Sequence, residues 1–558
     1  MYEYGIKRQA AMQDLGGAWL FKADKNNIGK KEAWENTFPN DAITMPVPSC
    51  WNNTPAYYDY TGVGYYKKEF FAKKGNAKII FEGVSNYCTV YLDGEEVLIH
   101  KGAYTGFCIY TNFKTDGTHT LVVRTDAYVD DENTVPNETR DWKVYGGIIR
   151  PVYLISLPEF FVDDLCVHYT LSEDLHTANA VLEFSAYGEG IHTYTLFADD
   201  KALKTTDVQA GKNKIAFTLE NIRLWNVLAP QLYTFSLESD TDAASVRTGF
   251  RKVAVNGRRI EVNNKPVYLR GVNRHEDHPE WGHALPLHIA KKDMDIIVNM
   301  GCNMIRGSHY PNSRAFLDLC DEYGILFWSE LPLWYYKEKQ AANEDIVNTI
   351  LKMGHEMIVQ NYNHPSIFTW GLHNECETST KTFLRLTEKM ATQYRTEDPS
   401  RLITYASDKV FDDICFKVCD FICVNRYPGW YGDEVEEWES FFNKFNTYLK
   451  EQNIPELPIM ISEFGGGGIY GQSSFESPKW SEQYQCEILE KSMEIFRKHP
   501  EVGGMMIWQY CDIRVRTAQA MSRPRTFNNK GLVNEYRQPK MAYYTAKKLY
   551  EQMAKEDE

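Results

Sequence analysis

The spacing of apolar positions changes character twice along the chain, near positions 160 and 250. In the first part, short β-prone runs alternate with turn signals, and Asp93-Gly94 and Asp116-Gly117 are typical of hairpin turns. Short strands at this spacing predict a β jelly roll. A long polar stretch, residues 127–149, interrupts the pattern, and we expect it to be either a disordered or a functional loop.

The middle part contains five further β-type runs at the spacing of an immunoglobulin-like β-sandwich. Residues 224–232 read as a fixed turn between two of its strands. Nothing in this part indicates chemistry.

After position 250, strand-like runs alternate with helical patterns, and each run is followed by a helical stretch. About eight such βα units in about 300 residues predict a TIM barrel. The chain is therefore predicted to be multidomain, with a jelly roll over residues 1–160, an immunoglobulin-like β-sandwich over 161–250 and a C-terminal (β/α)8 barrel over 251–558.

Two of the strand-like runs in the barrel end in a carboxylate. One ends in Asn374 and Glu375, and the other carries Glu463 into a glycine run. A carboxylate at the end of a buried strand is costly to desolvate unless it has partners or a function, and barrel enzymes place catalytic groups at this point. We expect both glutamates to face one pocket; the alternative is two ordinary strand ends with polar termini.

Composition narrows the choice of partner. The formal net charge of −15 argues against nucleic acid and against an anionic membrane, and an acidic substrate would need a local cationic site. The sequence has no apolar run of about 18 residues, so we expect no membrane-spanning helix. The N-terminal residues lack the apolar core of a signal peptide, which predicts a cytoplasmic protein, although a chain with its leader removed would read the same.

No metal or cofactor is expected. The 12 cysteines show no compact disulfide framework, and Cys415, Cys419 and Cys423 do not have the spacing of a metal cluster. The histidine-rich residues 274–283 match no standard zinc pattern, and the glycines at 465–468 lack the Lys-Ser/Thr of a phosphate loop.

Three segments, residues 303–328, 363–375 and 458–464, resemble the signatures of the family-2 glycoside hydrolases. With the domain order, the resemblance covers essentially the whole chain and makes the jelly roll a sugar-binding-like domain. It departs at Gly307, where the family more often has Ser, Thr or another small residue. The resemblance implies a retaining double displacement, with Glu463 as nucleophile and Glu375 as acid/base, about 5–5.5 Å apart.

Two further stretches, residues 424–431 and 527–531, resemble the β-glucuronidases. In those enzymes an asparagine and a lysine hold the carboxylate of the sugar, and Asn528 and Lys530 match them here; the alternative for so short a pattern is a solvated loop. An arginine assists in those enzymes, and the candidates are Arg523 and Arg525, of which we favour Arg525.

The resemblance also implies sugar contacts from other parts of the chain. Asp141 matches an acceptor for a sugar hydroxyl, with a structural salt bridge in the loop as the alternative reading. A tyrosine next to the nucleophile stabilises its charged form. The remaining candidates are His309, Asn374, Asn425, Tyr427, Tyr431 and Trp508, with His275 as an additional one.

The predicted activity is that of a retaining exo-glycosidase acting on β-D-glucuronides. Its partner would be a small-molecule or oligosaccharide glucuronide, and the family resemblance implies a homo-oligomer, either a dimer or a tetramer. The alternatives are a β-galacturonidase, a β-galactosidase or β-mannosidase, and a non-catalytic carbohydrate-binding protein. Because residues 330–363 are short for a lid, we also predict an open entrance for bulky or oligosaccharide aglycones.

Overall fold

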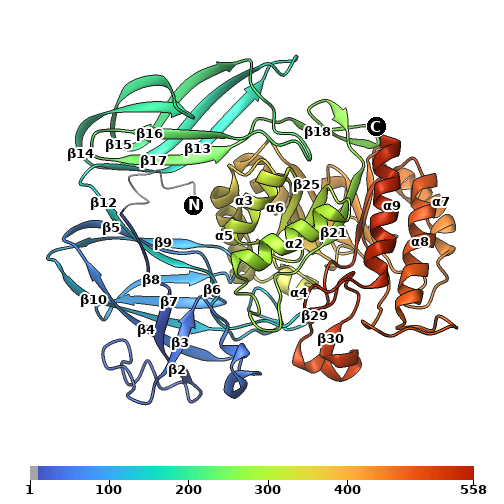
Figure 1. Ribbon diagram of the computed structural model, residues 1–558, viewed down its shortest axis with the longest axis horizontal. Helices are drawn as coiled ribbons and strands as arrows, with labels where there is room; N and C mark the ends of the chain where they lie inside the picture. Colours follow the sequence, from blue (N-terminus) through green and yellow to red (C-terminus); the bar gives the residue numbers. More distant parts are fainter. Residues whose placement is uncertain (1–10, 558) are drawn as a thin grey trace.

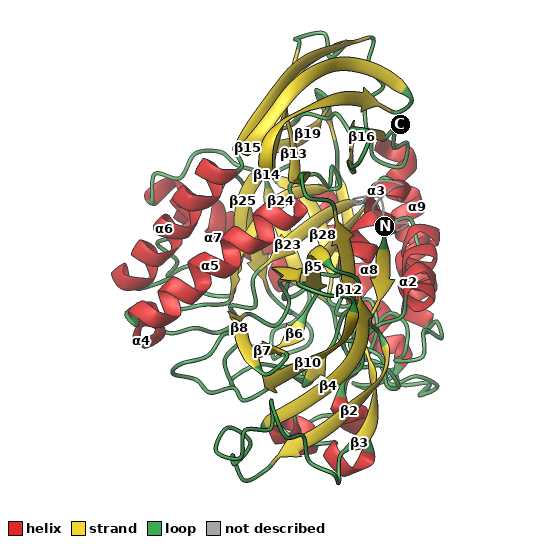
Figure 2. Ribbon diagram, turned by 90° about the vertical axis from the view of Figure 1, so that its left-hand side faces the viewer, coloured by secondary structure: helices red, strands yellow, loops and turns green. Residues whose placement is uncertain are grey.

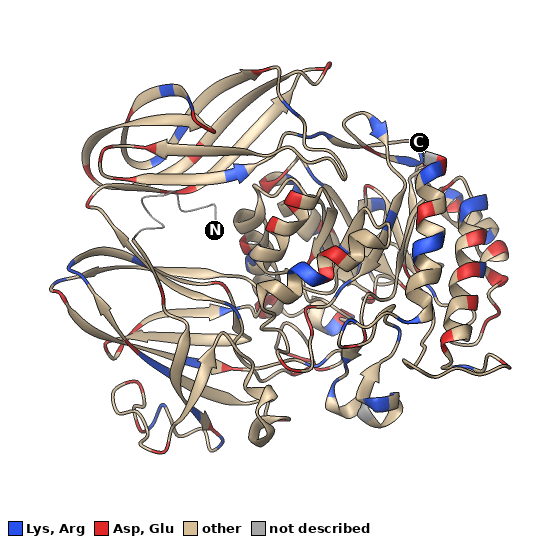
Figure 3. Ribbon diagram, viewed as in Figure 1, with Lys and Arg blue, Asp and Glu red and all other residues tan. Residues whose placement is uncertain are grey.

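The computed structural model describes residues 11–557, which form the three predicted bodies in chain order (Figure 1). The multidomain fold class is confirmed: two β domains precede a closed barrel of eight parallel strands. Lysines, arginines and acidic residues are interspersed over the helices of the barrel (Figure 3). Among the described residues, no helix has both the length and the apolar character needed to cross a membrane.

The jelly roll consists of antiparallel sheets of four and six strands, in the orders β1-β12-β5-β9 and β3-β2-β4-β10-β7-β8, and a two-stranded sheet of β6 and β11. Its core is rich in aromatic side chains, including Trp19, Phe21, Trp51 and Tyr66. The strands are β1 (Met12–Asp14), β2 (Gly17–Asp24), β3 (Ile43–Val47), β4 (Val63–Ala72), β5 (Gly75–Phe81), β6 (Val84–Ser85), β7 (Tyr87–Leu92), β8 (Glu95–Lys101), β9 (Phe107–Phe113), β10 (Gly117–Asp126), β11 (Gly147–Ile148) and β12 (Val152–Leu157).

Of the two hairpins predicted here, one is confirmed and one is wrong. Asp93 and Gly94 both have positive φ and join the paired strands β7 and β8. Asp116-Gly117 also forms a turn, but β9 pairs with β5 whereas β10 pairs with β4 and β7. This turn therefore crosses from one sheet to the other, because local turn chemistry does not determine which strands pair.

The second domain is a sheet of five antiparallel strands around its own core (Figure 2). Its long hairpin, β14 with β15, changes register after Ala186. The predicted fixed turn carries Trp225, which is fully buried and donates a hydrogen bond to the carbonyl of Asp321 in the barrel. The strands are β13 (Phe161–Leu171), β14 (Thr177–Ala198), β15 (Lys201–Glu220), β16 (Tyr233–Glu238) and β17 (Ala243–Thr248).

The barrel strands run in the order β21 to β28, and a small sheet of β18, β19 and β20 precedes them. The barrel is filled with side chains such as Met304, Trp328 and Met460, and Cys423 is one of this packed set. The strands are β18 (Val253–Asn256), β19 (Arg259–Val262), β20 (Lys265–Pro266), β21 (Leu269–Asn273), β22 (Met304–Gly307), β23 (Leu326–Glu330), β24 (Ile367–Asn374), β25 (Leu402–Ser407), β26 (Ile422–Asn425), β27 (Ile459–Phe464) and β28 (Val502–Ile507).

Helices cover the outside of the barrel after every strand except one (Figure 2). Residues 408–421, which follow β25, were predicted to include a helix and form only a short 3-10 turn, η4 (Phe416–Val418). The α-helices are α2 (Leu287–Asn299), α3 (Arg314–Tyr323), α4 (Glu338–Ala341), α5 (Glu344–Asn361), α6 (Lys381–Glu397), α7 (Glu437–Glu451), α8 (Glu482–Lys498) and α9 (Met541–Asp557). After β28 come β29 (Ile513–Arg514), η5 (Thr517–Ser522), η6 (Pro524–Thr526) and β30 (Phe527–Asn528).

Candidate active site

The barrel strands carry both predicted glutamates to the same end of the barrel. Strand β24 ends at Asn374 with Glu375 directly after it, and Glu463 is the penultimate residue of β27. Every residue of both strands is buried, so the two glutamates stand at the ends of tightly packed strands, where barrel enzymes place their catalytic groups. Glu375 has a φ of 50°, a backbone conformation that side-chain-bearing residues rarely adopt and that occurs at functional sites.

Arg306, at the end of β22, joins the two catalytic candidates' strands. Its guanidinium donates to Oε1 of Glu463 at 2.7 Å and to Oδ1 of Asn374 at 2.7 Å. It also forms a two-bond fork with Glu330, at 2.9 and 3.0 Å. Arg306 and Glu330 are fully buried, so each charge depends on the other for compensation.

Sequence reasoning missed Arg306 and Glu330. The available signal was a charged residue at the end of each of two strand-like runs, which is the same signal that identified the glutamates. The packing around the neighbouring Gly307 explains why glycine stands where the family more often has another small residue. A Cβ added at this position would lie 2.4 Å from the ring of Phe327.

Asn425, at the end of β26, bonds Glu375 and Asn374 and is itself held by Ser462. Its Nδ2 donates to Oε1 of Glu375 at 2.8 Å and to Oδ1 of Asn374 at 3.1 Å, while Ser462 fixes its Oδ1 at 2.7 Å. The Nδ2 group of Asn374 is buried and has no partner among the described residues. It is therefore a buried donor left without an acceptor next to Glu375, as a group that binds a ligand hydroxyl would be.

Tyr427 donates its hydroxyl to Oε2 of Glu463 at 2.5 Å. Burial raises the pKa of Tyr427 well above its usual range, and the charges of Glu463 and Glu375 raise it further. Both carboxylates therefore act on one hydroxyl group, which is consistent with a shared cavity.

The two carboxyl groups have different surroundings. Burial raises the pKa of Glu375 well above its usual range, and the nearby charges of Glu463 and Asp408 add to the effect. Burial also raises the pKa of Glu463, but Arg306 and the Tyr427 hydroxyl oppose the rise. The arrangement favours a protonated Glu375 beside an ionised Glu463.

Two histidines and a tryptophan line the pocket next to this pair. His309 stacks on Trp508, with ring centroids 5.1 Å apart, and its Nδ1 lies 2.8 Å from Glu330. His275 meets Trp508 edge-on and bonds Tyr310, while its Nε2 has no partner in the described chain. Burial lowers the pKa of both histidines well below the usual value, so both are neutral at pH 7.

Lys530 lies near the ring of Tyr427, whose hydroxyl bonds the nucleophile candidate. The lysine is 2% exposed and donates to the hydroxyl of Tyr431 at 2.5 Å. Its ammonium lies 4.6 Å from the ring centroid of Tyr431, 5.0 Å from that of Tyr427 and 5.7 Å from that of Trp430. Although burial opposes the change, the Lys530 charge lowers the pKa of Tyr431.

Asp141 reaches this group from the jelly roll, on the long polar loop of residues 127–149. It accepts hydrogen bonds from Asn528 at 2.7 Å and from Arg523 at 3.1 and 3.2 Å. Arg525 instead pairs with Glu535. The structure therefore joins Arg523, rather than the favoured Arg525, to the other candidate residues.

A family model described as "Glycosyl hydrolases family 2, TIM barrel domain" matches residues 253–555, more than half of the chain. The chain belongs to glycoside hydrolase family 2. The family's sugar binding domain matches residues 12–158, and a further family-2 model matches residues 161–251 of the hydrolase.

Among the similar proteins, some are named β-glucuronidases and others β-galacturonidases. The hydrolase is 29% identical to the "Beta-glucuronidase" of Paenibacillus borealis, over 95% of each chain. The structure of the β-galacturonidase of Eisenbergiella tayi bound to galacturonate matches it with a TM-score of 0.88 and 31% identity, over 97% of each chain. That of the Ruminococcus gnavus β-glucuronidase in complex with D-glucuronic acid matches with a TM-score of 0.88 and 29% identity, also over 97% of each chain.

Lys540 links two loops of the hydrolase's pocket. It is fully buried and donates to the carbonyl oxygens of Gly468 and Asn529, at 2.6 and 3.1 Å, and to Asp512 at 2.7 Å. One loop follows the strand of Glu463 and the other carries Lys530. No sequence pattern distinguished this lysine from a surface one.

The glycine run at 465–468 serves packing. An added Cβ on Gly466 or Gly467 would come within 3.1 Å of the Trp430 ring, so the loop can only lie against Trp430 without side chains. Trp430 in turn borders the ammonium of Lys530.

In the histidine-rich stretch of residues 274–283, Asp277 and His283 make contacts that support the fold. Asp277 accepts hydrogen bonds from the Tyr145 hydroxyl and the Arg514 amide, both at the boundary with the jelly-roll loop. His283 packs edge-on against Tyr145 and Tyr310.

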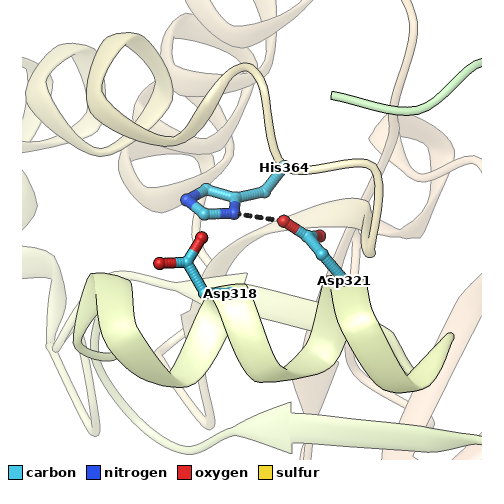
Figure 4. A group of neighbouring side chains, drawn as sticks. All are labelled: Asp318, Asp321 and His364. Atoms are coloured by element: carbon cyan, nitrogen blue, oxygen red, sulfur yellow. Dashed lines mark hydrogen bonds and ion pairs between the residues drawn. The ribbon is translucent and has the colours of Figure 1, made fainter. Parts of the chain in front are cut away.

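Among the described residues, one group has atoms close enough for a metal ion: Asp318, Asp321 and His364 (Figure 4). Nδ1 of His364 lies 2.6 Å from Asp321, which also accepts the amide of Ser366 at 3.0 Å. Burial opposes protonation of His364, but Asp321 raises its pKa, and a protonated imidazole is a poor ligand. The group anchors the start of β24 to α3.

Proposed function

We propose that this hydrolase is a retaining, exo-acting β-uronidase, and that β-D-glucuronides are its substrates. The observation that carries the proposal is the buried ammonium of Lys530, which contacts the ring of the same tyrosine that bonds Glu463. Among the described residues Lys530 is buried and forms no ion pair with an acidic side chain, and a buried ammonium without a counter-charge favours an anionic ligand.

In the proposed reaction, the Glu463 carboxylate attacks the anomeric carbon while Glu375 gives its proton to the departing glycosidic oxygen. The glycosyl ester on Glu463 is then hydrolysed by a water molecule that Glu375, now ionised, deprotonates. The roles follow from the surroundings: Arg306 and Tyr427 stabilise the anion of Glu463, whereas burial and like charge keep the proton on Glu375.

Asn374 is proposed to bind the 2-hydroxyl of the sugar through its unpartnered Nδ2. Arg306 holds the other end of that amide, so the donor points in one direction only. The stacked rings of His309 and Trp508 would form the floor beneath the sugar ring.

The uronate carboxylate is proposed to bind Lys530, with Asn528 and the hydroxyl of Tyr431 completing its hydrogen bonds. Arg523 would add a second positive charge that offsets Asp141, which leaves the latter to accept a sugar hydroxyl. This replaces the earlier preference for Arg525, whose charge is taken up by Glu535.

The names of the curated relatives favour glucuronides, whereas the structural neighbours include both a β-glucuronidase and a β-galacturonidase at similar identity. A panel of 4-nitrophenyl β-D-glycosides with the glucuronide, galacturonide, glucoside, galactoside and mannoside tests the proposal. We expect the glucuronide to have the highest kcat/KM. A higher value for the galacturonide would change the sugar but keep the reaction, whereas a higher value for a neutral glycoside would overturn the proposal.

A further inference from the structure

The segment after β23 lies directly beside the acid/base candidate. The amide of Asn374 donates to the carbonyl of Leu333 at 2.8 Å, and the amide of Tyr335 donates back to the carbonyl of Asn374 at 3.1 Å. Residues 333–336 therefore extend alongside the end of β24, one position from Glu375. Because the acid/base protonates the leaving oxygen, the leaving group begins where this segment lies.

Aromatic rings run from the floor of the pocket to this segment. Trp142 lies 5.3 Å from His309 and 6.1 Å from Trp334, and Trp334 lies 4.3 Å from Tyr335, measured between ring centroids. Trp142 is buried, whereas Trp334 and Tyr335 are only half-buried. We call Trp334 and Tyr335 the rim pair.

The rim pair has a fixed position. The carbonyl of Trp334 accepts from Asn137 of the jelly-roll loop at 3.0 Å, and the hydroxyl of Tyr335 lies 3.5 Å from Asp408. Burial raises the pKa of Tyr335, and the charges of Glu375 and Asp408 raise it further, as expected for a ring next to the acid/base.

Two lysines flank the ring of Tyr335. The ammonium groups of Lys337 and Lys409 lie 5.3 and 5.2 Å from its centroid. Lys409 is neutralised by Asp408, with both carboxylate oxygens at 2.6 Å. Lys337 has no acidic partner among residues 11–557, so it leaves the rim pair with one uncompensated positive charge.

The other acidic groups nearby are already engaged. Glu338 accepts the hydroxyl of Thr382 at 2.6 Å, and Glu377 accepts the amide of Glu338 at 2.6 Å. Neither is bonded to Lys337, so the charge of that lysine is available to a ligand.

We propose that the rim pair and Lys337 form the subsite for the leaving group, and that this subsite takes a pyranose with a negative charge. The proposal rests on the β-uronidase activity proposed above and names the class of its aglycone. Aromatic rings of this kind stack on the C–H face of a sugar ring, and a lysine is a point charge suited to a carboxylate or a sulfate ester. The substrate is thus an oligosaccharide that is acidic on both sides of the cleaved bond.

The test uses matched disaccharides whose non-reducing residue is the uronic acid that the wild-type enzyme prefers as its nitrophenyl glycoside. One pair compares N-acetylglucosamine with its 6-sulfate as leaving group, and the other compares glucose with glucuronate, so the source of the charge is resolved. We expect kcat/KM to be at least about fivefold higher for the charged member of at least one pair, with the preference reduced in 0.5 M NaCl by screening.

Variants assign the effect to residues. Lys337→Met is expected to abolish the preference for the charged member, whereas Lys339→Met, an exposed lysine two residues away that pairs with Glu132, should keep it. Tyr335→Ala is expected to raise KM about tenfold for both members of each pair, with a smaller change in kcat. Tyr335→Phe keeps the ring and should leave KM near the wild-type value.

The outcomes separate the two proposals. Failure of the wild-type enzyme to cleave any nitrophenyl uronide would contradict the β-uronidase activity itself. Normal cleavage of those uronides with no preference for a charged leaving group, or with the preference intact in Lys337→Met, would overturn the leaving-group proposal alone.

Discussion

The two ends of the pocket are built in different ways. At the glutamate end, Arg306, Glu330, Asn374, Asn425 and Glu463 all lie on barrel strands, and every one of them is buried. At the end where the uronate carboxylate is proposed to bind, called the carboxylate end, the contacts come from the jelly-roll loop, from the segment after β26 and from the irregular segment after β28 (Figure 1).

We expect this difference to separate the residues that carry out the reaction from those that select the sugar. Strand ends are fixed by the register of the closed barrel, so the glutamate end can perform one reaction on many sugars. Loops can change without disturbing that register, so the carboxylate end is where a particular sugar would be selected. Four experiments, with five substitutions in all, test this division.

Glu463→Gln should have the largest effect, because it removes the proposed nucleophile. We expect kcat to fall by about 10⁴-fold or more for uronides and neutral glycosides alike. Activity is measured on the nitrophenyl panel, with the unfolding temperature as a check that the variant is folded. Turnover within about tenfold of wild type would assign the nucleophile elsewhere.

Arg306→Lys should reduce kcat by about 10²- to 10³-fold on every substrate, because one ammonium cannot replace a guanidinium that bonds at least four side chains. Arg306 lowers the pKa of Glu463 against the effect of burial, so weakening it raises that pKa. The acid limb of the pH–rate profile should therefore move to higher pH. A loss restricted to uronides would place Arg306 at the selective end instead.

Lys530→Ala should reduce kcat/KM on the preferred uronide by about 10²-fold, mainly through KM, since a charge-assisted hydrogen bond in a buried site is lost. The matched neutral pyranoside should change by less than about threefold. Equal losses on both substrates would show that Lys530 supports the fold of the pocket and does not read the carboxylate.

Arg523→Gln and Arg525→Gln form a matched pair two residues apart. We expect a loss of about tenfold in kcat/KM on uronides for the first and a smaller one for the second, because only Arg523 is bonded to Asp141. The measurement is kcat/KM of both variants on the same uronide. A larger loss for Arg525→Gln would show that Arg525, the arginine favoured from the sequence, is the one that assists.

Local sequence patterns predicted the strand-borne part of the molecule best. Glu375 and Glu463 follow from apolar runs that end in a carboxylate, and the fold class follows from the same periodicity. The pattern gave less where long-range pairing decides the outcome: it indicated a hairpin at Asp116-Gly117, which instead connects two sheets, and a helix after β25, which is absent from the described structure.

The choice between Arg523 and Arg525 shows a second limit. Arg525 has a φ of 62° and Thr526 one of 64°, so the chain turns sharply between neighbouring side chains and sends the two arginines to different acids. Such left-handed conformations are uncommon for these residue types, and no propensity predicts them. The partners of Arg306 were hidden for another reason, since they come from four other strands that are distant in sequence.

Lys540 limits how far the two ends of the site can move relative to each other. Its ammonium connects the turn after the strand of Glu463 to the turn that bears Lys530, through the carbonyl groups of Gly468 and Asn529. A displacement of either turn must stretch or break this connection, or carry the other turn along. Side chains around Lys530 can thus be exchanged, but the distance between the Lys530 turn and the Glu463 turn is held by Lys540.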